Sequence, residues 1–406
     1  MRPEFPEKGV RPTGVCSPAG GRAVAKRGRG ILRRLLRWAG MALGVGLILG
    51  SVAFAVAYFR SDNVCDEPGT FAPAHPMRAV VYCAYGPPAV LRVENLEKPV
   101  PKDNQLLVKV RAASINPLDW HVIRGTPYFM RMMAGLRKPK DIQVGVDFAG
   151  TVEAVGSKVT RFRPGDAVFG GRDGAFAEYL TVGEDKAVAA KPTNITFQQA
   201  AGIPVAGITA LQALRDRAHA GPGQRILING ASGGVGTFAV QIAKARGAHV
   251  TGVCSTRNVD MVRALGADEV IDYKKDDFTK GDRKFDVIVD NVGNRSLAEC
   301  RRALVPDGKY ILIGGGGPQD QGVIGPMWKV AGAALKDKFV SQDMRFFLAN
   351  MNGKDLAVLA QLIQSGQVTP VVDRQYSLEM VKEAVGYVEQ GHARGKVVLT
   401  MEPGVR

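Results

Sequence analysis

A glycine-rich loop that joins two apolar segments constrains the fold of this chain more than any other feature. The loop is Gly230–Gly236, with a strand expected before it at Arg225–Asn229, a helix after it at Thr237–Arg246, and a second strand at His249–Cys254. Glycines allow the backbone to turn tightly and approach a pyrophosphate, and the helix N-terminus offers free N–H groups. Because all four parts occur in the required order, the segment predicts a dinucleotide-binding βαβ unit rather than a simple turn.

The end of the second strand indicates which dinucleotide is bound. Sites that prefer NAD usually carry Asp or Glu about 20 residues after the glycine loop, where the carboxylate holds the ribose hydroxyls. This chain has no carboxylate in Cys254–Asn258. Ser255 can donate a hydrogen bond to a 2′-phosphate, and Arg257 can pair with it. NADPH is therefore predicted over NADH, although Arg257 also fits a solvated position at the start of a helix.

The body of the chain divides into a β-rich part and an alternating part. Short strands separated by Gly and Pro begin at Met77, and strand–helix alternation, which predicts a parallel sheet, begins near Gln224. Thr196 and Gln199 form a capping-box signal, which predicts that a helix begins there, before the alternating part. The predicted fold class is α/β. The expected borders are a disordered basic segment 1–37, a transmembrane helix 38–59, a linker 60–76, a β-rich domain 77–203, a nucleotide-binding domain 204–340, and a C-terminal return to the β-rich domain at 341–406.

An uncharged run from Trp38 to Phe59 is long enough to cross a bilayer. Trp38 and Tyr58 stand near its two ends, where interfacial aromatic residues belong. We expect an uncleaved single-pass anchor. A signal peptide cleaved after Ala55–Ala57 and a true start at Met77 are alternatives.

The orientation of this anchor is left open by two opposed considerations. Residues 1–37 hold ten basic and two acidic side chains, and the positive-inside rule places such a segment in the cytoplasm. A single span then puts the rest of the chain outside. Access to NADPH favours a cytoplasmic domain instead, and we give this slightly more weight.

Charge and cysteine content exclude several other classes. Half of the net charge of +16 lies in residues 1–37, and no basic run in the body alternates with aromatic residues, so we expect no nucleic-acid partner. The five cysteines are an odd number without CxxC spacing, which predicts neither a disulfide framework nor a zinc ribbon. They are Cys16, Cys65, Cys83, Cys254 and Cys300.

Several separate motifs add a family resemblance. They are Ala112–Asp119, Gly145–Gly150, Arg163–Asp166, Ile208–Ala213, Asn229–Gly236 and Leu265–Asp268. From Met77 onward the chain resembles the medium-chain dehydrogenase/reductase superfamily, and within it the zinc-independent quinone oxidoreductase-like branch. The resemblance implies a GroES-like substrate domain, an inserted Rossmann domain, a return to the first domain, and a homodimer.

The resemblance also bears on metal binding. Zinc alcohol dehydrogenases of this superfamily hold zinc with Cys and His at positions matched here by Asn116 and Val146. Neither side chain can replace a thiolate or an imidazole, so no metal is expected. Without a Lewis acid, hydride delivery to an electrophilic quinone or α,β-unsaturated carbonyl is easier than alcohol oxidation. A non-catalytic NADPH-binding redox sensor or assembly protein, and a zinc alcohol dehydrogenase, are the alternatives.

The remaining site residues are carried over from the resemblance. The expected catalytic residues are Asn116, Asp119 and His121, the last at the position of a proton-relay histidine, where a structural histidine fits equally well. The expected cofactor contacts are Thr209, Gly230, Ser232, Gly233, Gly234, Val235, Gly236, Ser255, Arg257, Tyr273, Gly314 and Lys396.

Overall fold

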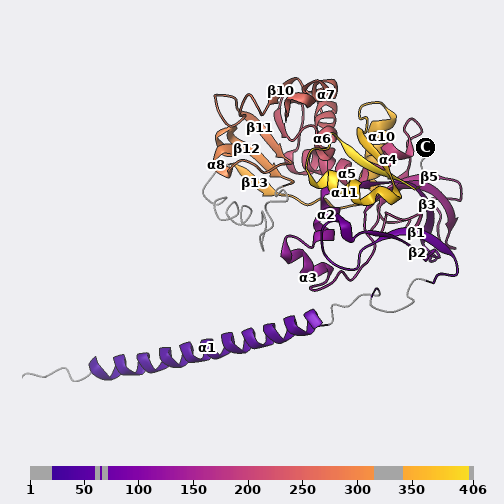
Figure 1. Ribbon diagram of the computed structural model, residues 1–406. Helices are drawn as coiled ribbons and strands as arrows, with labels where there is room; N and C mark the ends of the chain where they lie inside the picture. The colour runs from indigo at the N-terminus through magenta and orange to yellow at the C-terminus, as the bar shows by residue number, and fades with distance from the viewer. Residues whose placement is uncertain (1–20, 60–64, 66–71, 315–341, 402–406) are drawn as a thin grey trace, which may run out of the picture. The chain divides into compact units, whose positions relative to one another are not determined.

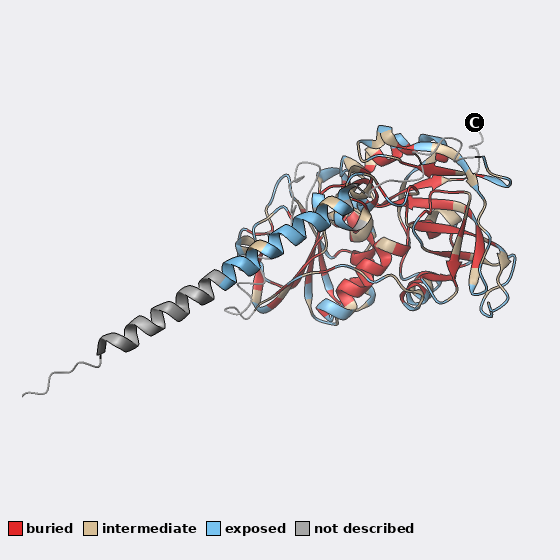
Figure 2. Ribbon diagram, turned by 90° about the horizontal axis from the view of Figure 1, so that it is seen from below, coloured by how far each residue is buried: buried red, intermediate tan, exposed pale blue. Residues whose placement is uncertain are grey.

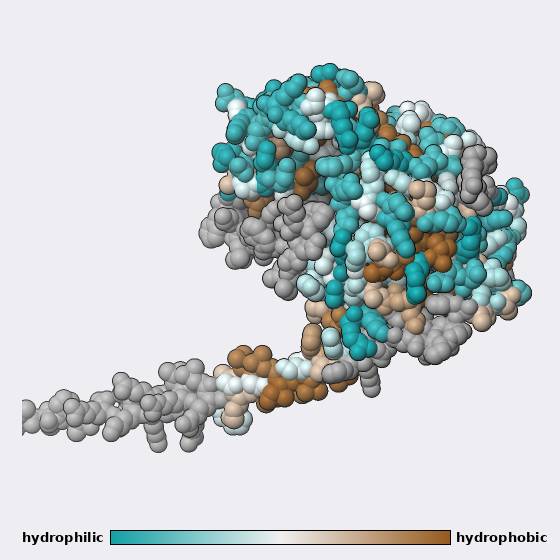
Figure 3. Space-filling view, in the orientation of Figure 1, coloured by the Kyte–Doolittle hydropathy of each residue, from teal (hydrophilic) through white to brown (hydrophobic). Residues whose placement is uncertain are grey.

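The computed structural model describes residues 21–59, 65, 72–314 and 342–401, and the chain forms two units, Met1–Arg60 and Ser61–Arg406. The described part of the first unit is one helix, α1, Gly21–Phe59. Residues 21–37 were expected to be disordered, and that prediction was wrong, because Ala, Leu, Arg and Lys favour a helix despite the glycines. The stretch Trp38–Val56 contains no buried residue and is long and apolar enough to cross a membrane (Figures 2 and 3).

A six-stranded parallel sheet forms the core of one lobe of the second unit (Figure 1). Its strands are β8 (Arg225–Asn229), β9 (His249–Cys254), β10 (Glu269–Asp272), β11 (Phe285–Asp290), β12 (Leu304–Leu312) and β13 (Asp343–Phe346). The spatial order is β10-β9-β8-β11-β12-β13, so the chain changes direction between β8 and β11. This is the strand order of dinucleotide-binding folds, in which the ligand lies at the carboxyl ends of the strands where the order reverses.

A seven-stranded sheet forms the core of the other lobe. Its strands are β3 (Gln105–Ile115), β4 (Asp147–Val155), β5 (Ala167–Gly171), β6 (Tyr179–Gly183), β7 (Val188–Ala190), β14 (Val372–Ser377) and β15 (Lys396–Thr400). The order is β14-β15-β3-β4-β5-β7, and β6 also pairs with β3. All pairs are antiparallel except β14–β15. Strands β1 (Pro76–Val81) and β2 (Arg92–Glu97) form a separate antiparallel pair.

Helices cover both sheets and connect the lobes. They are α2 (Pro117–Arg124), α3 (Arg131–Ala134), α4 (Phe197–Ala201), α5 (Pro204–Gln212), α6 (Gly234–Ala245), α7 (Val259–Ala264), α8 (Leu297–Arg302), α10 (Gly353–Gln364) and α11 (Val381–Glu389). The predicted capping box opens α4: the Gln199 amide donates to Thr196 Oγ1 at 3.2 Å, and the Thr196 amide donates to Gln199 Oε1 at 3.0 Å. The buried residues follow the two sheets and the helices packed on them (Figure 2).

The C-terminal part of the chain returns to the β-rich lobe, as expected, through β14 and β15. The border predicted at residue 340 was wrong, because β13 pairs with β12 and belongs to the parallel sheet. Strand β13 lies only two residues beyond the segment 315–341, which is outside the described residues. A strand of four residues, half-buried at a sheet edge, has too short an apolar pattern to be recognised from sequence.

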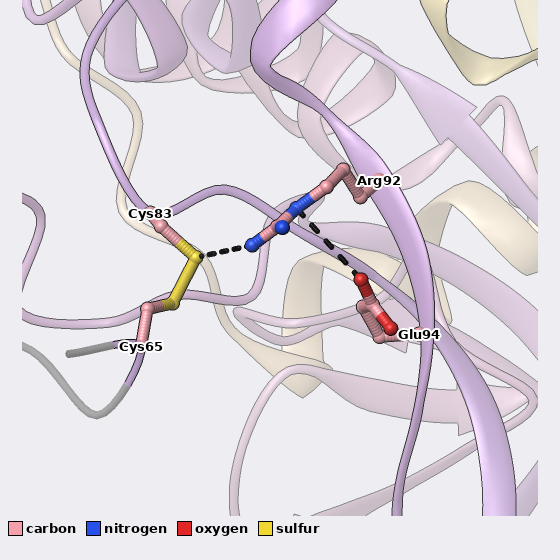
Figure 4. The surroundings of a disulfide bond; sticks show 4 residues. All are labelled: Cys65, Cys83, Arg92 and Glu94. Atoms are coloured by element: carbon pink, nitrogen blue, oxygen red, sulfur yellow. Dashed lines mark hydrogen bonds and ion pairs between the residues drawn. A yellow bond between two sulfur atoms is a disulfide. The ribbon is translucent and has the colours of Figure 1, made fainter. Parts of the chain in front are cut away.

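One disulfide joins Cys65 to Cys83, with Cα atoms 5.9 Å apart (Figure 4). A single bond is not a disulfide framework, but the cysteine spacing did not predict it. Two cysteines 18 residues apart carry no recognisable motif.

Candidate active site

The glycine loop lies at the carboxyl end of β8 and begins helix α6. Gly230 has φ +77, a left-handed conformation that side chains rarely adopt. A Cβ on Gly236 would lie 2.1 Å from the Gly230 carbonyl oxygen, so the loop closes tightly only without a side chain there. Gly233 caps α6, and the N–H groups of the first turn, Gly234–Gly236, have no partner within the helix. The loop therefore offers an N-terminal anion cradle at the point where the strand order reverses.

A buried polar cluster lies beside this loop. The register of β15 on β3 pairs Val397 with Ile115 and thereby brings Lys396 next to Asn116, while β4 pairs Asp147 with Ser114. The Lys396 ammonium donates to Asn116 Oδ1 at 2.6 Å and to Asp147 Oδ2 at 3.3 Å. The stem of Lys396 faces Gly234, where a Cβ would be 3.0 Å from Lys396 Cδ.

Asp147 is the anionic centre of the cluster. Its Oδ2 accepts hydrogen bonds from Asn116 Nδ2 at 3.0 Å and from Ser114 Oγ at 2.9 Å, and its Oδ1 accepts from the Val205 amide at 3.0 Å. Asp147 is fully buried and Lys396 is 3 % exposed. Val205 lies in the first turn of α5, so one carboxylate joins three strands of the β-rich sheet to the helix that packs on α6. A buried charge needs such complete pairing to persist.

Asp119, the third residue of α2, is hydrogen-bonded to the backbone of this cluster. Its Oδ2 accepts from the Asn116 amide at 2.6 Å. The pKa of Asp119 is raised to about 7, mainly by burial and also by the nearby carboxylate of Asp147, while the Asn116 N–H and Lys396 act in the opposite direction. Two of the three predicted catalytic residues, Asn116 and Asp119, are therefore in one hydrogen-bonded group.

His121 is held away from that group. Its Nδ1 lies 2.9 Å from the Thr126 carbonyl oxygen, which can only accept, so Nδ1 carries the proton. Its ring stacks on Trp120 with centroids 3.6 Å apart, and burial lowers its pKa. The hydrogen bond recorded for its ring goes to Thr126 rather than to Asn116 or Lys396. Thr209, a predicted cofactor contact, is buried on α5 and donates to the Val205 carbonyl oxygen at 2.6 Å.

Asn258, which the sequence analysis did not single out, connects residues at the end of the site where the 2′-phosphate is expected. Its Nδ2 donates to Ser232 Oγ at 2.9 Å and to Ser255 Oγ at 3.2 Å, tying the glycine loop to the end of β9. Arg257 is exposed, and its Nη2 donates to the His392 carbonyl oxygen at 2.7 Å. The structure thus brings Ser232, Ser255 and Arg257 to one edge of the parallel sheet.

Two further predicted contacts flank this edge. Tyr273 follows β10 and is 50 % exposed, which rules out the alternative that it is a core aromatic residue. Asp272, next to it, accepts from Thr256 Oγ1 at 2.7 Å, so a carboxylate that the sequence reasoning overlooked lies at the end of the third strand. Gly314 follows β12, and a Cβ there would lie 2.4 Å from the Asn291 carbonyl oxygen. The residues that follow Gly314, 315–341, lie outside the described residues.

The C-terminal loop before β15 completes the arrangement. Gly395 has φ +104 and pairs with Gly233 in an isolated parallel bridge. This contact places the loop before β15 against the glycine loop that begins α6. A separate surface groove lined by Arg124, Lys382 and Glu389 contains none of the predicted cofactor-binding or catalytic residues.

Comparisons with known proteins agree with this geometry. Residues 102–193 match the alcohol dehydrogenase GroES-like domain, and residues 265–399 match the family described as zinc-binding dehydrogenase. The quinone-oxidoreductase QR1 of Triphysaria versicolor is 33 % identical over 80 % of this chain and 98 % of its own length. The NADPH-dependent alkenal/one oxidoreductase of Arabidopsis thaliana is 36 % identical over 80 % of this chain and 79 % of its own length. The solved quinone oxidoreductase of Coxiella burnetii has a TM-score of 0.70 at 29 % identity, covering 80 % of this chain and all of that one.

The chain belongs to the medium-chain dehydrogenase/reductase superfamily. Its relatives place it in the quinone oxidoreductase-like branch, as the motifs had indicated. The GroES-like and Rossmann domains expected from that family are both present.

The donor set at the family's catalytic metal position does not suit zinc, although one matching family carries that name. The side-chain oxygen of Asn116 accepts a hydrogen bond from the Lys396 ammonium, and the aliphatic side chain of Val146 has no atom that can coordinate a metal. The ammonium already places a positive charge beside Asn116 and Asp147, which opposes a second cation there. Among the residues that the structure describes, no group of three or more His, Cys, Asp or Glu side chains could hold a metal ion. Zinc independence stays a prediction, and it now has an electrostatic reason.

Proposed function

We propose that this protein is an NADPH-dependent reductase of quinones or α,β-unsaturated carbonyls. The observation that carries the proposal is the contact between the glycine loop and the buried Lys396–Asn116–Asp147 cluster. The relatives named quinone oxidoreductase and NADPH-dependent alkenal/one oxidoreductase support the same chemistry. When bound, the cofactor would supply a hydride.

The chain's own residues have separable tasks in this proposal. The first turn of α6 would hold the pyrophosphate with backbone N–H groups. Arg257 and Ser255 would hold the 2′-phosphate, with Asn258 fixing the serine hydroxyl. Thr209 and Gly314 would line the nicotinamide end, and Tyr273 the adenosine end.

Lys396 is the residue best suited to stabilise charge on a reduced substrate oxygen. An ammonium has three N–H donors, and in the described part of the chain two of them go to Asn116 and Asp147. The third would stabilise a developing enolate or phenolate, an effect that is strong where water is excluded. Asp147 and Asn116 hold the ammonium in place.

We also propose that Trp38–Phe59 anchors the protein to a membrane. A 39-residue helix whose apolar part contains no buried residue supports this. An anchor would keep the enzyme close to substrates that dissolve in lipid. The homodimer expected from the family stays a prediction, which size-exclusion chromatography with light scattering checks.

The test follows NADPH absorbance with the full chain in detergent and a panel of quinones and enones. We expect turnover with at least one of them and a lower rate with NADH. Saturable NADPH binding without turnover on any of them would instead favour a non-catalytic redox sensor. A Lys396→Met variant should lose turnover while keeping most of its NADPH affinity.

A further inference from the structure

The catalytic unit, meaning the two lobes from β1 onward, is joined by a disulfide to Cys65 in the linker (Figure 4). Cys65 comes six residues after α1 ends at Phe59, and Cys83 comes two residues after β1 ends at Val81. Arg92 Nη2 lies 3.0 Å from Cys83 Sγ and its Nε lies 3.8 Å from Glu94. The bond thus ties Cys65 to the segment between β1 and β2.

Among the cysteines that the structure describes, exposure separates the bonded pair from the two free thiols. Cys65 and Cys83 are half-buried, whereas the free Cys254 and Cys300 are 2 % and 0 % exposed. Burial raises the pKa of Cys254 to about 11 and of Cys300 to about 12. A buried thiol that stays protonated is inert to oxidants, while the accessible pair is free to oxidise. Structural disulfides form and persist in oxidising environments and are rare in the cytosol, so the Cys65–Cys83 bond favours an oxidising environment.

We infer that the catalytic unit lies on the oxidising side of its membrane and that residues 1–37 lie on the cytoplasmic side. The inference rests on the proposed anchor. A second, independent observation agrees with it: ten basic and two acidic residues precede the span, which the positive-inside rule assigns to the cytoplasm. This orientation is the reverse of the one that access to NADPH had favoured.

The same bond shortens the tether between the span and the catalytic unit. Five residues lie between Phe59 and Cys65, against sixteen between Phe59 and Pro76. At about 3.5 Å per residue, the extended chain reaches about 20 Å with the disulfide and about 60 Å without it. The disulfide therefore shortens the greatest distance that the linker can span.

Thiol counting on the full chain tests the oxidation state. Cells that express the protein are quenched in acid, and the denatured chain is labelled with a maleimide that adds a fixed mass to each thiol. We expect three adducts, on Cys16, Cys254 and Cys300, and five after reduction. A Cys83→Ser variant should show four with or without reductant, and the Cys16→Ser control two and four. Five adducts on the unreduced native sequence overturn the inference.

Protease added to sealed, right-side-out membrane vesicles tests the orientation. A tag at the C-terminus should be digested without detergent, and one at the N-terminus only after detergent. The opposite pattern overturns the inference. Release of the chain from vesicles by alkaline carbonate also overturns it, because that result would show that the chain has no membrane anchor. Neither readout needs activity, so failure of the reductase assay is seen separately.

Discussion

Replacing Asp147 with asparagine removes the charge that neutralises Lys396 in the interior. The carboxylate is fully buried and accepts hydrogen bonds from Lys396, Asn116, Ser114 and the Val205 amide. Removing one partner of a buried ion pair costs about 3–5 kcal/mol, because the other charge is left uncompensated. An asparagine retains one oxygen, so the lower end of that range is the appropriate estimate. A loss of about 3 kcal/mol shifts the folding equilibrium roughly 150-fold.

Differential scanning calorimetry of the full chain in detergent measures this effect. At roughly 2–4 °C per kcal/mol for domains of this class, Asp147→Asn should lower the unfolding temperature of the catalytic unit by about 6–12 °C. The matched control is Asp103→Asn, which removes an exposed carboxylate that pairs with Lys158 at 2.9 Å and should change stability by less than about 1 kcal/mol. An unfolding temperature for Asp147→Asn equal to that of the control refutes the reasoning.

A double-mutant cycle separates the ion pair from simple loss of packing. Lys396→Met alone leaves Asp147 as an unpaired buried anion, and the double variant Lys396→Met with Asp147→Asn leaves neither charge. We expect the double variant to be less destabilised than the sum of the two single variants. Additive effects would show that the attraction between these two groups contributes little.

Four further results are expected. Arg257→Ala should raise the Kd for NADPH about tenfold or more and leave the Kd for NADH nearly unchanged, as isothermal titration calorimetry can measure. Gly236→Ala should abolish binding of both cofactors while the chain stays folded by circular dichroism, because the new Cβ meets the Gly230 carbonyl oxygen. The pKa of Asp119 is about 7 in the folded state against an ordinary 3.8, so between these pH values the folded state holds a proton that the unfolded state has lost. Stability should therefore fall as pH rises from about 4 to 7. Asp119→Asn should flatten this pH dependence in thermal melts. Metal analysis of the purified full chain should find well under one zinc per molecule, and a stoichiometric amount would contradict the electrostatic account of Lys396.

The nucleotide-binding unit was predictable because its signal is local. The loop Gly230–Gly236, the strand before it and the helix after it are adjacent in sequence. Strands β8 and β9 form where expected, and α6 begins at Gly234, three residues earlier than expected. The capping box at Thr196 was equally local. Such features depend on backbone conformation and capping, which neighbouring residues determine.

The features that the sequence concealed depend on contacts between distant residues. Asp147 stood in a motif that was recognised, yet its role follows from the pairing of β3 with β4 and β15, which brings Lys396 from 249 positions away. Cys65 and Cys83 likewise form a bond that no spacing rule indicates. Asn258 acquires its role only because the glycine loop turns back over the end of β9.

Deuteride transfer tests the central claim most directly. The full chain in detergent is given NADPH that carries deuterium on one face of nicotinamide C4, together with an enone that it reduces, and the product is analysed by NMR. Hydride delivery from a fixed nicotinamide predicts deuterium at the β-carbon from one labelled face and none from the other. Deuterium from both faces, or a reduced product without deuterium from either, would contradict the account.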